Sequence, residues 1–289
     1  MTGRNFSLSE QMRADSDVHS PHRVPDMCGR FSSLTPPGVL ARIFDAEVTP
    51  EIDGEEFHPN YNVAPSTRIF VIASSPSNGR RLGRMQWGLV PHWAKPPFGT
   101  GQINARSETI GEKPTFRDSY RKRRCVIPMT GYYEWRTVRG VEVLDSRPVL
   151  DPRAGAKREE KRAVYVTRRD GQPLAVAGLW SIWTSNHDLA DDRTGRDVAH
   201  REGELQRRTC CVVTRDANTT LATVHDRMPV VLEKEQWPVW LGENGPSDES
   251  DLQELLGSDP DSIDLSFVDV STLVNSVRNN GPELIVPVC

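Results

Sequence analysis

The stretch PDMCGRF places a methionine directly before Cys28. If translation starts at Met27, or if the preceding residues are removed, Cys28 becomes the first residue of the protein. An amino-terminal cysteine carries an amine with a pKa near ~7.7–8.0 beside a thiol with a pKa near ~8.5. Together these two groups condense with an aldehyde, because the amine forms an imine and the thiol then closes a thiazolidine ring. As an internal residue, Cys28 would instead be a buried structural thiol.

Three further motifs place a polar side chain among apolar or aromatic neighbours. INARSE contains Asn104 and Arg106, GYYEWR contains Glu134, and TVHDRMP contains His225. A carboxylate between two aromatic residues invites partial burial, which raises a carboxyl pKa, and histidine exchanges protons near neutrality. A structural role stays open for each of these residues. Asn104 could cap a turn, Glu134 could lie on the solvent-exposed face of a strand, and His225 could be a hydrogen-bonded histidine near the surface.

The histidines and cysteines form no metal-binding pattern. The cysteines contain no CxxC pair, and the histidines show no HxxxH or finger spacing. Glycine-rich phosphate loops are also missing. We therefore expect no metal and no cofactor. The histidines are His19, His22, His58, His92, His187, His200 and His225.

Composition limits the remaining classes of protein. The chain has 289 residues, 36% of them hydrophobic and 26% charged, with a net charge of -4. These values are typical of a soluble globular protein, and any nucleic-acid surface must be a local patch. FRDSYRKRRC, with five basic residues in the nine positions after Phe116, is the best candidate for that patch. Without a signal peptide or an apolar span, and with an odd number of cysteines, we expect a reduced cytoplasmic protein that makes no membrane contact.

The elements that position these residues are mainly strands. The β-like runs are RIFVIA, RMQWGLV, CVIP, AVYVT, LAVAGLWSI and TCCVVT, the first two joined as a hairpin. Helices are expected at TPPGVLARIF, with Thr35 as cap, and at SDESDLQELLG, ending at Gly257. Because βαβ alternation is absent, the sequence predicts an α+β fold: a single domain with a largely antiparallel sheet or open-barrel core and peripheral helices.

The chain divides into a short leader and one long domain. Residues 1–27 are polar and aperiodic, so we expect a disordered leader or a mis-assigned start. Residues 28–289 would form the domain. Two charged, aperiodic segments near 137–162 and 184–207 interrupt its strands, and we interpret them as surface insertions.

Seven motifs occur in an order that resembles the SRAP family: MCGRF, YNVAPS, QWGLVPHW, INARSET, GYYEW, HDRMP and SVRNNGPELI. The resemblance runs from Cys28 to about Pro287. These proteins were first called SOS response-associated peptidases and are described as abasic-site processing, DNA–protein crosslinking proteins. The resemblance implies a monomer of the SOS response to DNA damage, associated with the nucleoid when bound to DNA. It would bind single-stranded DNA, capture the abasic-site aldehyde through Cys28, and have the replication machinery as a further partner.

The resemblance also implies a role for each matching residue. Catalysis would use Cys28 as the crosslinking nucleophile, Asn104 beside its amine, and Glu134 and His225 as acid–base groups. DNA contacts would come from Arg30 and Arg106 at phosphates, Asn62 and Pro65 along the strand, Trp93 as an aromatic wedge, and Trp135 near the bound DNA.

Two other interpretations stay open. The family also carries a peptidase label, which fits a cysteine peptidase or N-terminal-nucleophile amidohydrolase that uses Cys28 and removes its own leader. The protein could also be a binding module that only shields single strands, with Cys28 incidental. Crosslinking to an abasic oligonucleotide separates a lyase-like capture activity from simple shielding. A peptide assay without DNA tests the peptidase.

Overall fold

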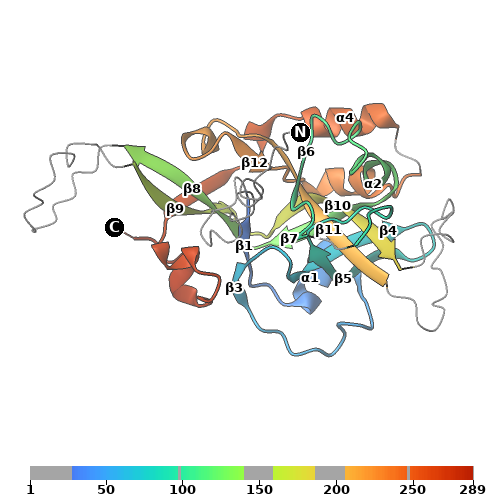
Figure 1. The fold of residues 1–289 in the computed structure, drawn as a ribbon, viewed down its shortest axis with the longest axis horizontal. Coiled ribbons are helices and arrows are strands. Elements are labelled where there is room, and N and C mark those ends of the chain that lie inside the picture. The colour runs from blue at the N-terminus through green and yellow to red at the C-terminus, as the bar shows by residue number, and fades with distance from the viewer. Residues whose placement is uncertain (1–27, 97–98, 140–158, 186–205, 246–247, 289) are drawn as a thin grey trace, which may run out of the picture.

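Two β-sheets with peripheral helices make up the structure, a computed structural model that describes residues 28–96, 99–139, 159–185, 206–245 and 248–288 (Figure 1). Most strand pairs are antiparallel, and no βαβ crossover organises the described chain. The predicted α+β class with a largely antiparallel, barrel-like core is therefore confirmed.

The larger sheet closes into a ring. Its order is β12-β11-β10-β7-β4-β5-β2, and β11 also pairs with β5 in parallel, through Thr209 with Gln86 and Cys210 with Trp87. That pairing joins the two ends of the run β11-β10-β7-β4-β5, and β6 adds to β11 in parallel. The strands are β2 (Glu47–Val48), β4 (Arg68–Ser75), β5 (Gly79–Trp87), β6 (Asn104–Arg106), β7 (Arg124–Met129), β10 (Leu174–Thr184), β11 (Gln206–Asp216) and β12 (Arg227–Pro229).

The smaller sheet carries the amino-terminal motif. Its order is β13-β9-β8-β1-β3, with every pairing antiparallel. Strand β8 pairs with β1 through Tyr133 with Arg30 and Tyr132 with Phe31, so GYYEW and MCGRF lie side by side. The strands are β1 (Arg30–Ser33), β3 (Asn60–Val63), β8 (Gly131–Arg139), β9 (Glu159–Arg168) and β13 (Leu265–Asp269).

The helices are short and lie at the periphery. They are α1 (Pro37–Phe44), α2 (Arg117–Lys122), α3 (Trp237–Leu241) and α4 (Glu249–Gly257). Single 3-10 turns, η2 to η6, cover Leu221–Thr223, Lys234–Gln236, Pro260–Ser262, Thr272–Asn275 and Pro282–Ile285. None of the helices in the described ranges is long and apolar enough to cross a membrane.

Both predicted helices exist, but their caps differ from the prediction. Helix α1 is preceded by Pro36 at the cap position, not by Thr35, and no side chain caps it. The prolines fix φ near the helical value and remove one unpaired N–H, so the helix starts without a polar cap. Helix α4 ends at Gly257 as predicted, yet Asp248 at its start makes no side-chain cap bond.

The predicted insertions begin and end as strands. Strand β8 continues to Arg139 and β9 begins at Glu159, while β10 runs to Thr184 and β11 starts at Gln206. Their charged residues therefore extend two hairpins, because the cross-strand ladder continues beyond the apolar runs. The middle parts, 140–158 and 186–205, lie outside the described residues, as does the predicted leader 1–27.

Three apolar clusters hold the two sheets together. Cys28 and Tyr132 belong to a cluster that contains one face of the ring strands, including Trp87. Tyr133 and Trp135 belong to a different cluster, under the carboxy-terminal turns. Alternate residues of β8 therefore face two different interiors. This alternation places Glu134 on the same side as Cys28.

Candidate active site at Cys28

Cys28 and Glu134 form the centre of the candidate site. Cys28 lies two residues before β1, and Glu134 lies in the neighbouring strand β8. The backbone nitrogen of Cys28 donates to Oε1 of Glu134 over 2.6 Å. Both residues are buried, at 5% and 4% exposure. A carboxylate is thus held directly on the nitrogen that would become an α-amine in a chain starting at Cys28.

Burial sets the electrostatics of this pair. Burial raises the pKa of Glu134, and this is opposed by the hydrogen bonds from Cys28 and by the nearby charge of His225. Burial also raises the pKa of the Cys28 thiol, the neighbouring carboxylate of Glu134 raises it further, and the charge of Arg227 opposes both. The thiol is therefore held in its protonated form, and the carboxyl group of Glu134 holds its proton more tightly than a solvent-exposed glutamate does.

His225 lies at the rim of the same site. It follows the η2 turn, to which its backbone nitrogen is bonded through Leu221 O at 3.0 Å, and its side chain is 25% exposed. Ring atom Nδ1 accepts from the backbone N–H of Arg227 at 3.0 Å and lies 2.9 Å from Oδ1 of Asp226. The imidazole ring of His225 is thus held through Nδ1, and part of the ring is exposed to solvent.

Arg227 is a site residue that the sequence reasoning missed. Its guanidinium donates to both carboxylate oxygens of Glu108, at 2.6 and 2.9 Å, and to Asp216 at 2.5 Å and Thr214 O at 2.9 Å. The residue is 8% exposed. Its position inside HDRMP, two residues after the histidine, is the available signal.

Tyr132 was missed as well. It lies two positions before Glu134 on the same strand face, it is 1% exposed, and it packs in the cluster that contains Cys28. Burial, followed by the charges of Cys28 and Glu134, raises the pKa of its phenol. The motif GYYEW offers two tyrosines, and only the register of β8 distinguishes them.

Three residues that were expected to contact DNA lie together on the face of the smaller sheet that is opposite to Glu134. Arg30 and Asn62 are buried at 9% and 4% exposure and bond to each other, Nη1 to Oδ1, at 2.8 Å. Trp135 is 7% exposed and donates from Nε1 to Asn275 at 2.7 Å. All three side chains are engaged with the protein interior in this structure.

The remaining predicted residues lie nearer the surface. Trp93 is 45% exposed, Arg106 is exposed, and Pro65 is half-buried. Asn104 is half-buried in β6, alongside Val212 of β11. The structure thus holds the nitrogen of Cys28 on Glu134, and His225 is near enough for its charge to lower the pKa of Glu134.

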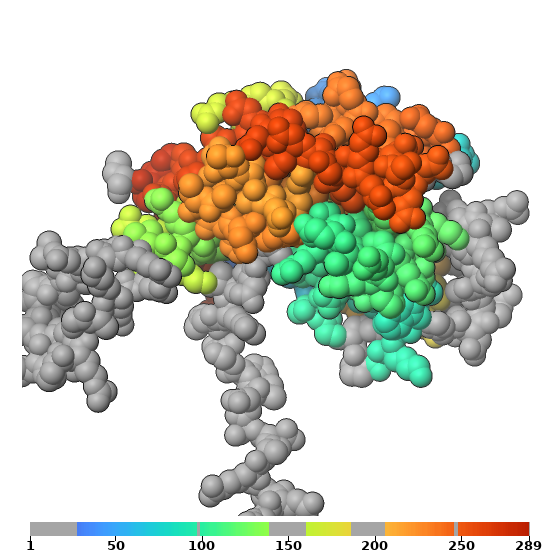
Figure 2. Space-filling model, turned by 90° about the horizontal axis from the view of Figure 1, so that it is seen from above, coloured from blue at the N-terminus to red at the C-terminus, as the bar shows by residue number. Residues whose placement is uncertain are grey.

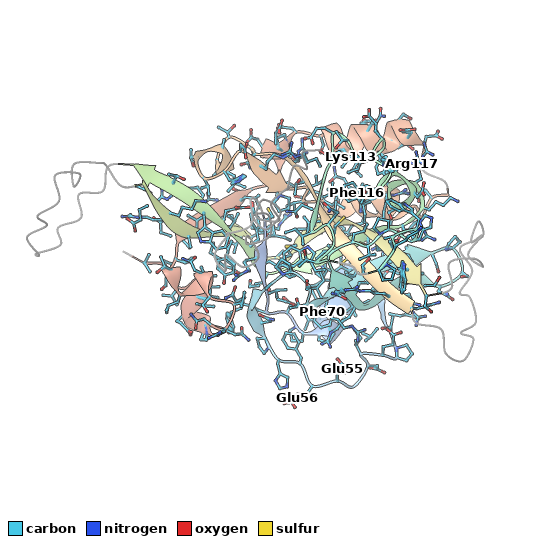
Figure 3. All side chains as sticks on the ribbon, in the orientation of Figure 1. Glu55, Glu56, Phe70, Lys113, Phe116 and Arg117 are labelled. Atoms are coloured by element: carbon cyan, nitrogen blue, oxygen red, sulfur yellow. The ribbon has the colours of Figure 1, made fainter. Side chains whose placement is uncertain are left out.

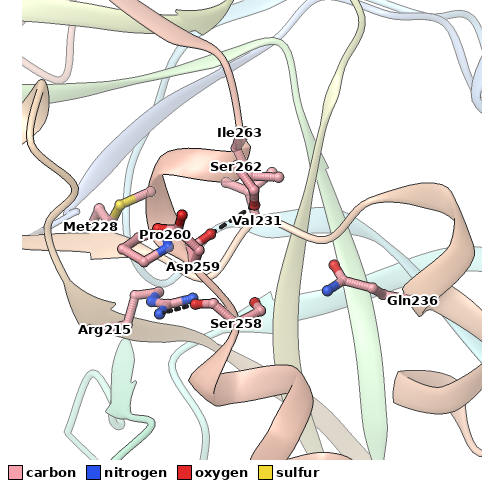
Figure 4. Close-up of a pocket in the computed structure, with 9 residues that line it drawn as sticks. All are labelled: Arg215, Met228, Val231, Gln236, Ser258, Asp259, Pro260, Ser262 and Ile263. Carbon is pink, nitrogen blue, oxygen red and sulfur yellow. Dashed lines mark hydrogen bonds between the residues drawn. The ribbon is translucent and has the colours of Figure 1, made fainter.

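The structure has a larger and a smaller hollow, and both are lined in part by the segment that is orange in Figure 2. The larger, about 430 Å³, lies between the 107–120 segment and helix α4, and its wall includes Glu108 and Asp216, the two carboxylates that hold Arg227. The smaller, about 10 Å³, has Arg215 and Ser258 in its wall, joined by a hydrogen bond from the guanidinium to Ser258 O (Figure 4). Neither is lined by a predicted site residue. Within the described chain, no three His, Cys, Asp or Glu side chains are grouped to hold a metal.

Comparison with known proteins matches nearly the whole chain. The family model described as SOS response associated peptidase (SRAP) matches residues 27–277. Abasic site processing protein YoqW of Bacillus subtilis (strain 168) is 36% identical over 261 residues, covering 90% of this chain and 99% of that protein. Abasic site processing protein HMCES of Pongo abelii is 29% identical over 289 residues, covering 91% and 76%. A crystal structure of a protein from Bacteroides thetaiotaomicron aligns with a TM-score of 0.65 at 25% identity, over 91% of this chain and 100% of that one.

Proposed function

The chain belongs to the SOS response associated peptidase (SRAP) family, and from this premise we propose that it captures abasic sites in single-stranded DNA as a covalent thiazolidine on Cys28. Several relatives are named abasic site processing proteins, which identifies the substrate class. A ring-opened abasic sugar presents an aldehyde at C1′ and no base. The proposed partner is therefore single-stranded DNA that contains such sites.

The single observation that carries this proposal is the 2.6 Å hydrogen bond from the nitrogen of Cys28 to Glu134. In a chain that begins at Cys28, that nitrogen is an α-amine, and its ammonium form makes a charge-assisted bond to the carboxylate. The carboxylate can accept a proton from the ammonium and so free the amine. It can then return the proton to an oxygen that leaves as water.

The amine reacts first in this scheme. Its lone pair attacks C1′ and forms a carbinolamine, which expels its hydroxyl as water and becomes an imine. The thiol then adds: sulfur bonds to the former C1′ carbon, and the thiol proton passes to the nitrogen. Water is the only other product. The order follows from the raised pKa of the thiol, because a buried protonated sulfur is a poor first nucleophile.

Acid–base support comes from His225 at the rim of the site. His225 is partly exposed and close enough for its charge to affect Glu134, so it suits proton transfer to the sugar oxygen during ring opening. Asn104 cannot titrate, and its proposed role is to orient the amine or the sugar. Tyr132 completes the buried wall beside Cys28.

The surrounding surface supports binding of a single strand. Arg106 is exposed and suits a phosphate, and Trp93 is exposed and suits stacking on a base. Pro65 is half-buried, so only one edge of its ring would contact the DNA strand. We propose these three residues as strand contacts around the buried pair.

The proposal requires that residues 1–27 be absent from the active protein. Within a longer chain the nitrogen of Cys28 is an amide, whose lone pair is delocalised into the preceding carbonyl and cannot form an imine. The backbone of Cys28 also has φ +31°, an uncommon value for a residue with a side chain. That torsion ceases to exist when nothing precedes Cys28, so removal of the leader releases the associated strain.

The peptidase alternative has weaker support. Nucleophilic cysteines are activated by a lowered pKa next to a cation or an imidazolium. Here burial and Glu134 raise the pKa of the Cys28 thiol, and Arg227 only opposes them. The family description still favours one peptidase act, the removal of the leader by the site itself.

Intact mass spectrometry of a chain that begins at Cys28 tests the proposal. After incubation with single-stranded DNA containing one abasic site, we expect a heat-stable adduct with the mass of protein plus oligonucleotide minus one water. Cys28→Ala should bind the strand with unchanged affinity and give no heat-stable adduct, since an amine alone forms a reversible imine. A wild-type protein that binds the strand and gains no mass would refute thiazolidine capture.

A further inference from the structure

A carboxy-terminal segment, residues 274–280, lies directly behind β8, which carries Glu134, and β1, which follows Cys28. Val274 is fully buried in the cluster that contains Tyr133 and Trp135, the two residues on either side of Glu134. Trp135 donates from Nε1 to Oδ1 of Asn275 at 2.7 Å. Strand β8 is therefore supported from behind by this segment while its front face holds Glu134.

Arg30 bonds the same segment to strand β1. Its Nη1 donates to Val274 O at 3.0 Å and its Nη2 to Asn275 O at 3.4 Å. These two carbonyls end the η5 turn, where unpaired backbone oxygens favour a cation. Burial lowers the pKa of Arg30, and no carboxylate is bonded to it among the described residues.

Asn62 completes the attachment from strand β3. Its Nδ2 donates to Val274 O at 3.2 Å, Ser276 O at 3.0 Å and Asn279 O at 2.9 Å, while its Oδ1 accepts from Arg30. The adjacent backbone N–H of Tyr61 donates to Oδ1 of Asn280 at 2.7 Å. One amide side chain thus gathers three carbonyls and orients the guanidinium beside it.

We propose that residues 274–280 position the reactive pair, with Arg30, Asn62 and Trp135 as positioning residues that keep the nitrogen of Cys28 on Glu134. The inference deepens the proposed function and rests on it. It replaces the expected role of Arg30 and Asn62 at the DNA, since both side chains already bond inward. Arg30 lies two residues from Cys28 and Trp135 one from Glu134, so their attachment fixes both partners.

The geometry explains why loss of this support should matter. A hydrogen bond of 2.6 Å between two buried groups is lost with a displacement of about 1 Å. Misplacement on that scale costs roughly 100-fold in a reaction that depends on orientation. Burial is the main cause of the raised pKa of the Cys28 thiol, and the neighbouring carboxylate is the second, so moving Glu134 away from Cys28 lowers that pKa.

Substitution of Asn275 tests the inference without DNA. Asn275 is exposed apart from its bond to Trp135, so Asn275→Leu should fold while removing the acceptor, and Asn275→Asp keeps an oxygen there. The readout is the rate of alkylation of Cys28 by iodoacetamide, followed by peptide mass spectrometry. For Asn275→Leu we expect at least about a threefold faster rate at pH 7.5, and for Asn275→Asp the wild-type rate.

Three core thiols serve as internal controls for folding. Cys125, Cys210 and Cys211 are fully buried, and they should remain unreacted in both variants. Faster alkylation of Cys28 with these three unchanged supports local positioning. Equal Cys28 rates in wild type and Asn275→Leu would overturn the inference.

Arg30→Lys separates positioning from phosphate contact. Lysine keeps the charge and loses the forked hydrogen bonds. We expect capture of an abasic oligonucleotide to slow by at least 10-fold, with the affinity for intact single strands and its salt dependence unchanged. Weaker binding with a smaller salt slope would instead assign Arg30 to a phosphate. If wild type captures nothing while Asn275→Leu still changes Cys28 alkylation, the proposed function fails and the positioning role stands.

Discussion

At the scale of single residues, the site is an acid buried beside a nitrogen. Glu134 accepts from Cys28 one position beyond the last residue pair of the β1–β8 ladder, and both residues are buried. The buried carboxylate of Glu134 has no compensating charge when the nitrogen of Cys28 is a neutral amide. It is paired with a positive charge when that nitrogen is an α-ammonium. The protonation state of Glu134 therefore depends on whether Cys28 is the first residue.

Glu134→Gln should stabilise the chain that still carries residues before Cys28, at neutral pH only. Burial raises the folded-state pKa of Glu134 above its unfolded value near ~4.3. Below pH ~4.3 the carboxyl group of Glu134 is protonated in both the folded and the unfolded state, so it does not reduce the free energy of unfolding. That stability is lost as the pH rises through the folded-state pKa. Denaturant unfolding should show equal stability of the two proteins at pH 4 and a gain for the variant at pH 8, about 1.4 kcal/mol per unit of pKa difference.

The control for that prediction is the chain that begins at Cys28. There the α-ammonium compensates the carboxylate, so the gain from Glu134→Gln should shrink or reverse at pH 7. A gain of equal size in both chains would contradict the pairing of Glu134 with the amine.

Glu108→Gln should destabilise the protein by about 1 kcal/mol at pH 7, because it weakens the bidentate bond to Arg227. The Glu108 side chain is 45% exposed, so solvent screens part of the interaction. Burial raises the pKa of Glu108, but the hydrogen bonds and charge of Arg227, together with a backbone hydrogen bond and one from Ser107, lower it below its usual value. The stabilisation is thus present above ~4.3 and lost as pH falls through the folded pKa. Asp216→Asn, with one bond and 86% exposure, is the matched control and should cost less.

Sequence reasoning could identify the reactive side chains but not the direction in which each one points. Cys28, Glu134 and His225 stood out because their chemistry is unusual for their surroundings. The inward direction of Arg30 and Trp135 depends on the pairing of β1 with β8 and on a segment that is 244 residues from Arg30 and 140 from Trp135. No local pattern encodes that contact.

At the scale of elements, the smaller sheet depends on a close approach at Gly131, the first residue of β8. A Cβ there would lie 2.5 Å from Cζ of Tyr165 and 2.6 Å from Val166 O. Tyr165 is in turn bonded through its hydroxyl to Ser32 of β1 at 2.6 Å. Because Gly131 has no Cβ, strands β1, β8 and β9 can pack closely against one another at this point.

Gly131→Ala should therefore destabilise the protein by about 1–3 kcal/mol, the usual cost of overpacking, or more if β9 must shift. Gly38→Ala in helix α1 is the matched control, since nothing lies within 4 Å of its Cβ position. That substitution should stabilise by about 0.5–1 kcal/mol. Thermal unfolding of both variants provides the comparison, and equal effects would contradict the packing argument.

Elements with a strong periodic signal were predictable, and those defined by pairing were not. The hairpin of β4 and β5 and helices α1 and α4 follow from turn residues and apolar spacing. The basic segment forms α2 beside helix α4, where Lys113 and Arg117 are labelled in Figure 3. One of its five cations, Arg124, is buried with its guanidinium on Trp240 O and Tyr120 O, so it cannot contribute to a surface patch. Ring closure by β11 and β5 has no sequence signal at all.

At the scale of the whole molecule, the state of the amino terminus should control activity. A chain translated from Met27 and trimmed to Cys28 should capture an abasic oligonucleotide, whereas a chain retaining residues 1–27 should bind it without capture. Mass analysis of the protein from its native cell should find Cys28 first. Capture by a protein that still carries Met1 would refute the mechanism.

The bond between Arg30 and Val274 spans 244 residues of sequence, which has a consequence for biosynthesis. The ribosome makes the nucleophile at the start and its supporting segment near the end. At ~5–20 residues per second, roughly 12–50 s separate the two. During that interval the nascent chain lacks the carbonyls to which Arg30 and Asn62 bond. Under the proposed capture, an incomplete polypeptide would therefore carry a cysteine that is not yet aligned, and only a nearly finished one could become attached to DNA.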